Sequence, residues 1–297
     1  MSPSMRVQPT MPNAKDAAQD EVGKPKFLLV GSTGSGKTAQ IATLPGKTFA
    51  YLFDPSALST LRGFDIEYET FYPSKVKMSA QSLKKGVGDT TAAAEDASET
   101  YRLWEQDFED RVKNKFWDTI DNIAFDSFTT FGDIVMDRIL KLNGRVGHFP
   151  QEDDYPAQMQ TITNVVRTLT SMNKLLMFTA HDEFKQDSVT SRMQNVIILT
   201  GRLRTKIPLL FSEIWHMECR STPEKIDYVA QTRPDRMNPQ VRCTIRDLDM
   251  FHDITIRNWK KPQDYGIGKL CREKLGYNPT RLMGIPGGKV AETSAKV

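Results

Sequence analysis

The sequence contains the segment Gly31-Ser32-Thr33-Gly34-Ser35-Gly36-Lys37-Thr38, which directly follows an apolar run at residues 27–30. Glycines at this spacing let the chain curl so that successive backbone N–H groups converge on one point. An apolar strand, a glycine-rich turn and a helix start together predict a loop that holds nucleotide phosphates. We expect all eight residues to surround the phosphates, with Lys37 reaching the β- and γ-phosphates and the Thr38 hydroxyl binding Mg²⁺. The preceding strand argues against a simple glycine-rich turn with a surface lysine.

The composition is that of an ordinary globular protein, with 39% hydrophobic and 26% charged residues in a chain of 297. This length suits one large α/β domain with extensions, or two small domains. The longest apolar run falls well short of the roughly 18 residues that a membrane-spanning helix needs, and the N-terminus lacks a signal-peptide pattern. Cys219, Cys243 and Cys271 are scattered without C-x-x-C spacing, which argues against a disulfide framework or a zinc site. We therefore expect a cytoplasmic protein that does not contact membranes.

The charges are distributed unevenly, although the net charge is only +3. Residues 89–137 hold 13 acidic and 4 basic side chains, whereas residues 201–246 hold 9 basic and 5 acidic ones. Such a distribution is compatible with a basic face for a polyanion, or with an acidic-to-basic contact between neighbouring subunits. For the acidic block, solvated helix faces are the favoured interpretation.

Apolar runs and helical periodicity alternate along the chain, which predicts an α/β fold with a mainly parallel twisted sheet flanked by helices. Beyond Ile207 the pattern changes to short, mostly antiparallel strands. We expect loops at residues 75–91 and 144–155. The predicted strands are 26–30, 48–53, 66–71 (an edge strand), 122–126, 175–180, 213–219, 228–232 and 241–245, and the predicted helices are 36–43, 94–115, one following residue 126, and 157–172.

Asp126 is the candidate for the carboxylate that holds Mg²⁺ from the end of a second strand. It ends the apolar run Ile123-Ala124-Phe125. Asp126 or Ser127 could also cap the next helix, and Asp126 could bind the metal and cap the helix at the same time. AAA+ and helicase-type enzymes usually place a water-polarising glutamate directly after this aspartate. Ser127 stands there instead, so the catalytic base must come from elsewhere.

Asp54, directly beyond the second predicted strand, is the candidate for that base. In RecA-type ATPases a glutamate just beyond the second strand polarises water, and an aspartate is one methylene shorter. Asp54 precedes Pro55, so the alternative is a turn-forming role. If Asp54 is not the base, hydrolysis is slow or uses Glu67, Glu69 or a residue of a neighbouring subunit.

His181 follows the strand predicted at residues 175–180. The carboxyl ends of strands are where the sites of α/β proteins gather. A neutral imidazole donates one hydrogen bond and accepts another, so His181 is suited to sense the γ-phosphate. A histidine with only local hydrogen bonds at the strand end is the alternative.

With these features in place, the chain resembles the RecA-like phage ATPases, a group of AAA-domain nucleotide-binding proteins that includes phage single-strand annealing and recombination proteins. The resemblance covers roughly residues 25–256. The one clear departure is Asp54, where the relatives tend to carry a glutamate. The matching blocks are GSTGSGKT (31–38), IAFDS (123–127), LLMFTAH (175–181), GRLR (201–204) leading to Pro208, FSEIW (211–215) and TRPD (232–235).

The resemblance implies a RecA-like P-loop NTPase core with ATP and Mg²⁺ as cofactors. It also implies self-association into a ring or filament, single-stranded DNA as a partner, and a phage single-strand-binding or replication protein as a further one. It places the ATPase domain at residues 25–256. The composition of residues 1–24, with few large apolar side chains, predicts a flexible arm, with a partner-binding arm as the alternative. Residues 257–297 are expected to form a C-terminal extension whose polar end is frayed. Four basic residues are candidates for DNA contact, for an arginine finger toward the next subunit's ATP, or for a merely solvated loop: Lys185, Arg202, Arg204 and Lys206.

Three functions compete at this point. The leading prediction is an ATP-dependent protein that acts on single-stranded DNA in phage recombination, annealing or replication. The second is a nucleotide-dependent switch or structural ATPase that binds a protein partner without DNA, which Ser127 and the short carboxylate of Asp54 favour. The third is a small-molecule kinase, which would need a lid with clustered arginines, but residues 75–91 offer only lysines.

Overall fold

The computed structural model describes residues 23–72, 90–146, 148–186, 191–277 and 279, excluding the side chains of residues 90–97. The predicted arm at 1–24 lies almost wholly outside the described residues. The predicted loop at 75–91 and the predicted frayed end also lie largely or wholly outside them.

One eight-stranded sheet forms the centre of the molecule, with the strand order β10-β9-β8-β1-β5-β4-β2-β3. The strands from β8 to β3 run parallel, while β9 and β10 are antiparallel to their neighbours. The predicted α/β fold is therefore confirmed, including the antiparallel strands toward the C-terminus and the edge position of β3. The strands are β1 (Lys26–Val30), β2 (Thr48–Leu52), β3 (Glu67–Thr70), β4 (Asn122–Asp126), β5 (Leu175–Ala180), β8 (Glu213–Ser221), β9 (Ile226–Gln231) and β10 (Phe251–Asp253).

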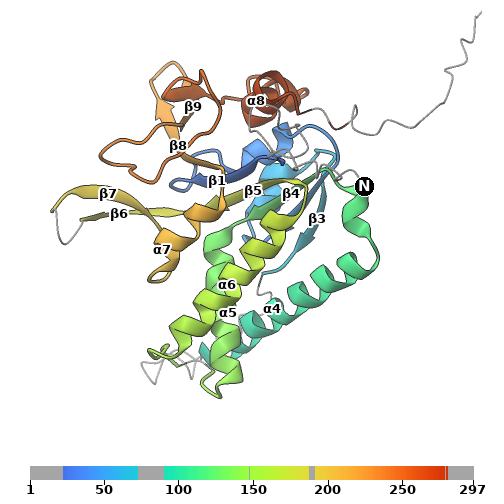
Figure 1. The fold of residues 1–297 in the computed structure, drawn as a ribbon, viewed down its shortest axis with the longest axis vertical. Coiled ribbons are helices and arrows are strands. Elements are labelled where there is room, and N and C mark those ends of the chain that lie inside the picture. Colours follow the sequence, from blue (N-terminus) through green and yellow to red (C-terminus); the bar gives the residue numbers. More distant parts are fainter. Residues whose placement is uncertain (1–22, 73–89, 147, 187–190, 278, 280–297) are drawn as a thin grey trace, which may run out of the picture.

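Helices cover both faces of this sheet (Figure 1). Successive side chains of β1 point to opposite faces, so Leu28 belongs to one apolar core while Phe27 and Leu29 belong to the other. The first core lies under α4 (Thr90–Lys113), α5 (Phe128–Leu142) and α6 (Asp154–Ser171). The second lies under η1 (Thr38–Thr43), α2 (Ala57–Leu61) and α8 (Gly266–Leu275). Short segments η2 (Phe116–Thr119), α7 (Leu203–Lys206), η3 (Pro208–Leu210) and η4 (Pro262–Asp264) complete the described helices.

Aromatic rings fill the first core directly beneath the strand ends that carry the candidate site. The rings of Phe125 and Phe178, on neighbouring strands, stack with centroids 4.8 Å apart. Phe53 packs 4.6 Å from Phe125 and is fully buried. Because these large side chains have no room to move in a close-packed core, the backbone at Asp54 and Asp126 is held in place.

One prediction about the C-terminal strands is wrong. Residues 241–245 form no strand, and their backbone meets the sheet at an isolated bridge between Arg242 and Ile214. Beside this bridge the Glu213 carboxylate accepts a hydrogen bond from the Thr244 backbone N–H, which occupies a donor that a strand ladder would use. The strand predicted at 213–219 forms as β8, which pairs antiparallel with β9 and parallel with β1.

A second sheet, absent from the prediction, is the hairpin of β6 (Asp182–Gln186) and β7 (Met193–Ile197). It projects from the body of the molecule directly after β5 (Figure 1). The hairpin places Asp182 one residue beyond His181. Lys185 lies within it.

The helix predicted at residues 36–43 forms only as a 3₁₀-helix, η1. Its side chains bind the start of α8: Gln40 Oε1 accepts from the Ile267 N–H at 3.0 Å, and Thr43 Oγ1 accepts from the Gly268 N–H at 3.0 Å. These bonds hold the segment against a neighbour that sequence reasoning did not identify. Residues 266–277 thus pack on the same body as the phosphate loop, while the domain boundary at residue 256 remains a prediction.

Gly268 is the tightest point of this contact, since a Cβ there would lie 1.6 Å from the backbone oxygen of Thr43. We expect Gly268→Ala to lower the free energy of unfolding by at least about 2 kcal/mol, because backbone must move to admit the methyl group. Urea unfolding measures the change. Lys269→Ala, at the neighbouring exposed position, is the matched control and should change stability by less than about 0.5 kcal/mol. Equal stability of the two variants would contradict this packing.

Candidate nucleotide-binding site

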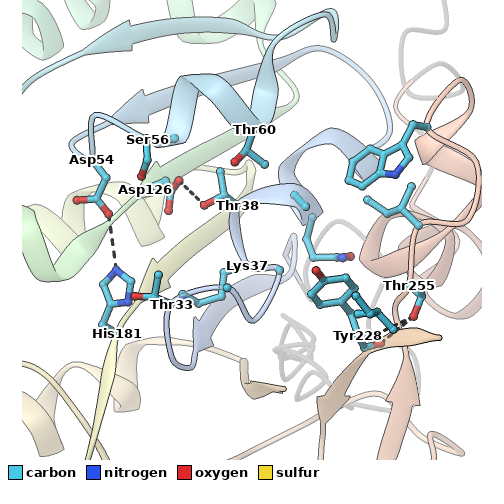
Figure 2. Close-up of a pocket in the computed structure, with 18 of the residues that line it drawn as sticks. Thr33, Lys37, Thr38, Asp54, Ser56, Thr60, Asp126, His181, Tyr228 and Thr255 are labelled. Carbon is cyan, nitrogen blue, oxygen red and sulfur yellow. Dashed lines mark hydrogen bonds and ion pairs between the residues drawn. The ribbon is translucent and has the colours of Figure 1, made fainter. Parts of the chain in front are cut away.

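The parallel strands β2, β4, β5 and β1 are neighbours, so their carboxyl ends meet at one edge of the sheet. The loop 31–38 follows β1, Asp54 follows β2, Asp126 ends β4 and His181 follows β5. Side chains from all four places line one cavity of about 790 Å³ (Figure 2). This volume lies within the range of small-molecule sites.

The glycines of the loop are required by its conformation. Gly34 and Gly36 have φ values of +81° and +85°, in the left-handed region that favours glycine. A Cβ on Gly36 would also lie 2.8 Å from the ring of Tyr228, and a Cβ on Gly31 would lie 2.5 Å from the Met217 backbone oxygen. The loop therefore packs closely on β8 and β9.

Lys37 folds back over its own loop. Its Nζ donates to the backbone oxygens of Gly31 at 2.7 Å and Ser32 at 2.8 Å, and to Ser35 Oγ at 3.3 Å. Burial lowers the pKa of Lys37, although the carboxylates of Asp126, Asp182 and Asp54 act in the opposite direction. A phosphate that enters the loop would offer this ammonium charged oxygens in place of neutral ones, and charged acceptors form the stronger hydrogen bonds.

Thr38 and Asp126, the two predicted metal ligands, are in contact. Thr38 Oγ1 donates to Asp126 Oδ2 at 2.8 Å, and the Thr179 hydroxyl donates to the other carboxylate oxygen. Burial raises the pKa of Asp126, and the two hydroxyl hydrogen bonds oppose that rise. The alternative role of Asp126 as a helix cap belongs instead to Ser127, whose side chain accepts from the Thr130 N–H at the start of α5.

The oxygens of Thr38 and Asp126 fit a hard cation. Mg²⁺ commonly takes one or two protein oxygens and completes its octahedron with phosphate oxygens and water. Among the described residues no group of three or more His, Cys, Asp or Glu side chains is placed to hold a metal. With a nucleotide in the loop, Thr38 and Asp126 would hold Mg²⁺ together with its phosphate oxygens.

Asp54 and His181 lie side by side on the cavity wall (Figure 2), with Asp54 Oδ2 3.7 Å from His181 Nε2. The Thr130 hydroxyl donates to the other oxygen of Asp54. Burial raises the pKa of Asp54, but hydrogen bonds from His181, Thr130 and Ser127 outweigh it, so the pKa is lowered. Asp54 is thus an ionised carboxylate at neutral pH, able to orient water.

The alternatives for the catalytic base lie elsewhere. Glu67 and Glu69 are on the edge strand β3, where Glu67 pairs with Lys47 at 2.7 Å and Glu69 with Arg111 at 3.5 Å. Neither residue is among those that line the cavity. The turn-forming role of Asp54 coexists with its place at the site, because its backbone oxygen accepts from the Ala57 N–H at the start of α2.

The four basic candidates lie outside the cavity lining. Lys185 is exposed on β6, and Arg202 and Lys206 are exposed at the two ends of α7. Arg204 is partly engaged within the chain: its Nε donates to the Leu199 backbone oxygen at 2.7 Å, and its guanidinium lies 3.6 Å from Glu183. Their predicted roles remain predictions.

Sequence reasoning missed one end of the cavity, which is lined by Ile226, Tyr228, Ile256 and Trp259. These residues come from β9 and from the chain after β10, and Trp259 lies in the predicted C-terminal extension. No motif marks them, because their relation to the loop exists only through the pairing of β8 with β1 and β9.

Lys37→Ala should abolish nucleotide binding while the protein stays folded, since the ammonium donates its hydrogen bonds to the loop and the side chain lines the cavity. Calorimetric titration with ATP and Mg²⁺ measures the affinity, and circular dichroism monitors the fold. Lys113→Ala, which removes an exposed lysine of α4 outside the cavity, serves as the control. Unchanged affinity in Lys37→Ala would contradict the assignment of the loop.

No helix in the described part of the chain combines the length and apolar character needed to cross a bilayer.

Comparison with known proteins places the chain in a family. No curated protein matches the chain. Among solved structures, a KaiC-like protein from the hyperthermophilic archaeon Pyrococcus horikoshii aligns at 12% identity, covering 81% of this chain and 88% of that one with a TM-score of 0.37, a likeness too weak to carry an argument. The AAA-domain family model, in contrast, matches residues 23–240, which include the phosphate loop, Asp54, Asp126 and His181. The chain therefore belongs to the AAA-domain family of nucleotide-binding P-loop ATPases.

Proposed function

We propose that this protein hydrolyses ATP with Mg²⁺ and uses the nucleotide cycle to act on single-stranded DNA in recombination, annealing or replication. The observation that carries the nucleotide part is the contact of Thr38 Oγ1 with Asp126 Oδ2 at 2.8 Å, in a cavity bounded by the glycine loop. An oxygen from the loop and one from β4 thereby meet at one point. The pair is arranged to share a cation with bound phosphates.

In the proposed hydrolysis, Thr38 and Asp126 would hold Mg²⁺, which would neutralise charge on the phosphates. Lys37 holds the β- and γ-phosphates after leaving the loop oxygens of Gly31 and Ser32. Asp54, which is ionised at neutral pH, orients the attacking water and accepts its proton. His181 lies 3.7 Å from Asp54. It donates a hydrogen bond to the γ-phosphate, and this bond is lost when the phosphate leaves.

The β6–β7 hairpin supports a partner outside the nucleotide site. Phe184 is 56% exposed and Met193 is 43% exposed, and alternation along the paired strands places both on one face. Lys185 is exposed on the other face, and Arg192 is exposed just before β7. An exposed ring and nearby cations suit single-stranded DNA, in which bases stack on aromatic rings and phosphates attract basic groups.

The hairpin is also connected to the nucleotide site. Its first residue, Asp182, directly follows His181 and lies 2.8 Å from His216 Nε2 on β8. His216 is within 3.4 Å of Asn195 on β7. A change at His181 on loss of the γ-phosphate would therefore reach the base of the hairpin through one peptide bond and this polar contact. Such a link between site and hairpin is what an ATP-dependent DNA-binding cycle requires.

A nucleotide-dependent switch that binds a protein remains the second candidate. The apolar face of the hairpin, with Phe184 and Met193, would suit a protein surface as well as DNA bases. DNA binding distinguishes the two functions, because only the first predicts an affinity that falls steeply with salt.

We expect the protein with ATP and Mg²⁺ to bind a labelled single-stranded oligonucleotide at about 50 mM salt, and to release it as salt rises. Phe184→Ala should weaken this binding roughly tenfold through lost stacking. Fluorescence anisotropy measures both effects. Phe149→Ala, which removes a ring that is 94% exposed outside the hairpin, is the matched control. Absence of DNA binding at low salt, with nucleotide-dependent self-assembly retained, would instead favour the protein-binding switch.

Asp54→Asn should reduce the rate of ATP hydrolysis by about a hundredfold or more, because the amide cannot accept the proton from water. Nucleotide affinity should remain near that of the unaltered protein. A phosphate-release assay and calorimetry measure the two quantities. Glu67→Gln, on the edge strand, is the control and should hydrolyse ATP normally. Normal hydrolysis in Asp54→Asn would show that the base lies elsewhere.

A further inference from the structure

The cavity extends beyond the phosphate loop to an apolar end that the hydrolytic residues do not use. Figure 2 shows Tyr228 and Thr255 on the far side of Lys37 and Thr38 from Asp54 and His181. This end is walled by the side chains of Ile226, Tyr228, Ile256 and Trp259.

The order of groups along the cavity sets the direction of a bound nucleotide. Lys37 binds the β- and γ-phosphates, and Asp54 and His181 lie on the γ-phosphate side. The opposite end must then receive the parts of the nucleotide beyond the α-phosphate, which are the ribose and the base. This assignment rests on the proposed function, since it requires a nucleoside triphosphate in the loop.

Trp259 presents a ring at this end. Its indole is 51% exposed, and one side of it packs on Phe64 with ring centroids 6.0 Å apart. Ile226 is 55% exposed and lines the same cavity. Trp259 packs on a neighbouring ring, lines the cavity and is half exposed, so its indole is suited to stack on a base.

Among the described residues at this end, the polar side chains of Gln40 and Thr255 are engaged by the protein itself. Gln40 Nε2 donates to the Ile254 backbone oxygen at 3.1 Å, while its Oε1 accepts from the Ile267 N–H. Thr255 Oγ1 accepts from the Tyr228 N–H at 2.8 Å and donates to the Tyr228 backbone oxygen at 3.3 Å. The Tyr228 hydroxyl, which also belongs to this wall, donates and accepts equally well.

We infer that this apolar end holds the nucleobase by stacking on Trp259 and by contact with Ile226 and Tyr228, and that it accepts adenine and guanine alike. Strong discrimination between bases requires side chains that hydrogen-bond the base edge, because a mismatched ligand then leaves buried polar groups unpaired. Gln40 and Thr255 are not free to do so. The site thus takes nucleoside triphosphates of both purine bases rather than ATP alone.

Calorimetric titration of the full-length protein tests this inference, with Mg²⁺ and non-hydrolysable analogues of ATP and GTP, and with tripolyphosphate as a ligand that lacks the base. We expect the two analogues to bind with affinities within about tenfold of each other. Trp259→Ala should weaken both by roughly tenfold and leave tripolyphosphate binding unchanged. Trp259→Phe, which keeps a ring, should recover most of the affinity, and Phe149→Ala is the control.

Tryptophan fluorescence supplies a second readout. The other three tryptophans, Trp104, Trp117 and Trp215, are at most 5% exposed, so Trp259 is the indole that a bound base can reach. Both analogues should quench the fluorescence, tripolyphosphate should not, and the quenching should vanish in Trp259→Ala.

Either of two results would overturn the inference: unchanged affinity of both analogues in Trp259→Ala, or a preference for one analogue greater than about a hundredfold. Failure of the proposed function would look different. In that case the unaltered protein would bind neither tripolyphosphate nor either nucleotide, because the phosphate loop itself would be inactive.

Discussion

The contact of the Thr38 hydroxyl with the buried carboxylate of Asp126 depends on the order of the strands. A carboxylate that is only 2% exposed is costly to keep ionised unless hydrogen bonds satisfy it. Burial raises its pKa, while the hydroxyls of Thr38 and Thr179, which satisfy both of its oxygens, and the charge of Lys37 oppose that rise. Those groups come from the segments that follow or form β1, β5 and β4, so the parallel register of three adjacent strands is what makes the site.

The aromatic core fixes that register from below. Phe53, Phe125 and Phe178 are fully buried, and each lies within three residues of a polar group at the cavity. Packed rings of this kind resist displacement, since a shift at one ring requires its neighbours to move. Asp126 therefore lies on a rigid strand, and Asp54 and His181 follow directly beyond strand ends, which is the kind of support that precise chemistry requires.

The antiparallel C-terminal strands have a role that the phosphate loop does not suggest. Strand β8 pairs with β1 on one side and with β9 on the other. Strand β9 therefore lies beside the loop, and Tyr228 packs against Gly36. The chain after β10 then brings Trp259 to the same cavity. Residues 257–277 belong to this assembly, because α8 binds η1 through Gln40 and Thr43. One continuous body thus provides a polar end for phosphates and an apolar end beside it.

The sequence by itself determined the phosphate loop at 31–38, the parallel sheet and the placement of Asp54, Asp126 and His181 at strand ends, because each depends on residues adjacent in the chain. Only the tertiary structure decided that Asp126 meets Thr38 while Ser127 caps α5, that η1 is a 3₁₀-helix, and that Trp259 faces the cavity. These outcomes depend on contacts between distant segments, such as that of Gln40 with Ile267, 227 residues apart. Contacts of this kind leave no local pattern of hydrophobicity or spacing, so they arise only once the strands have paired.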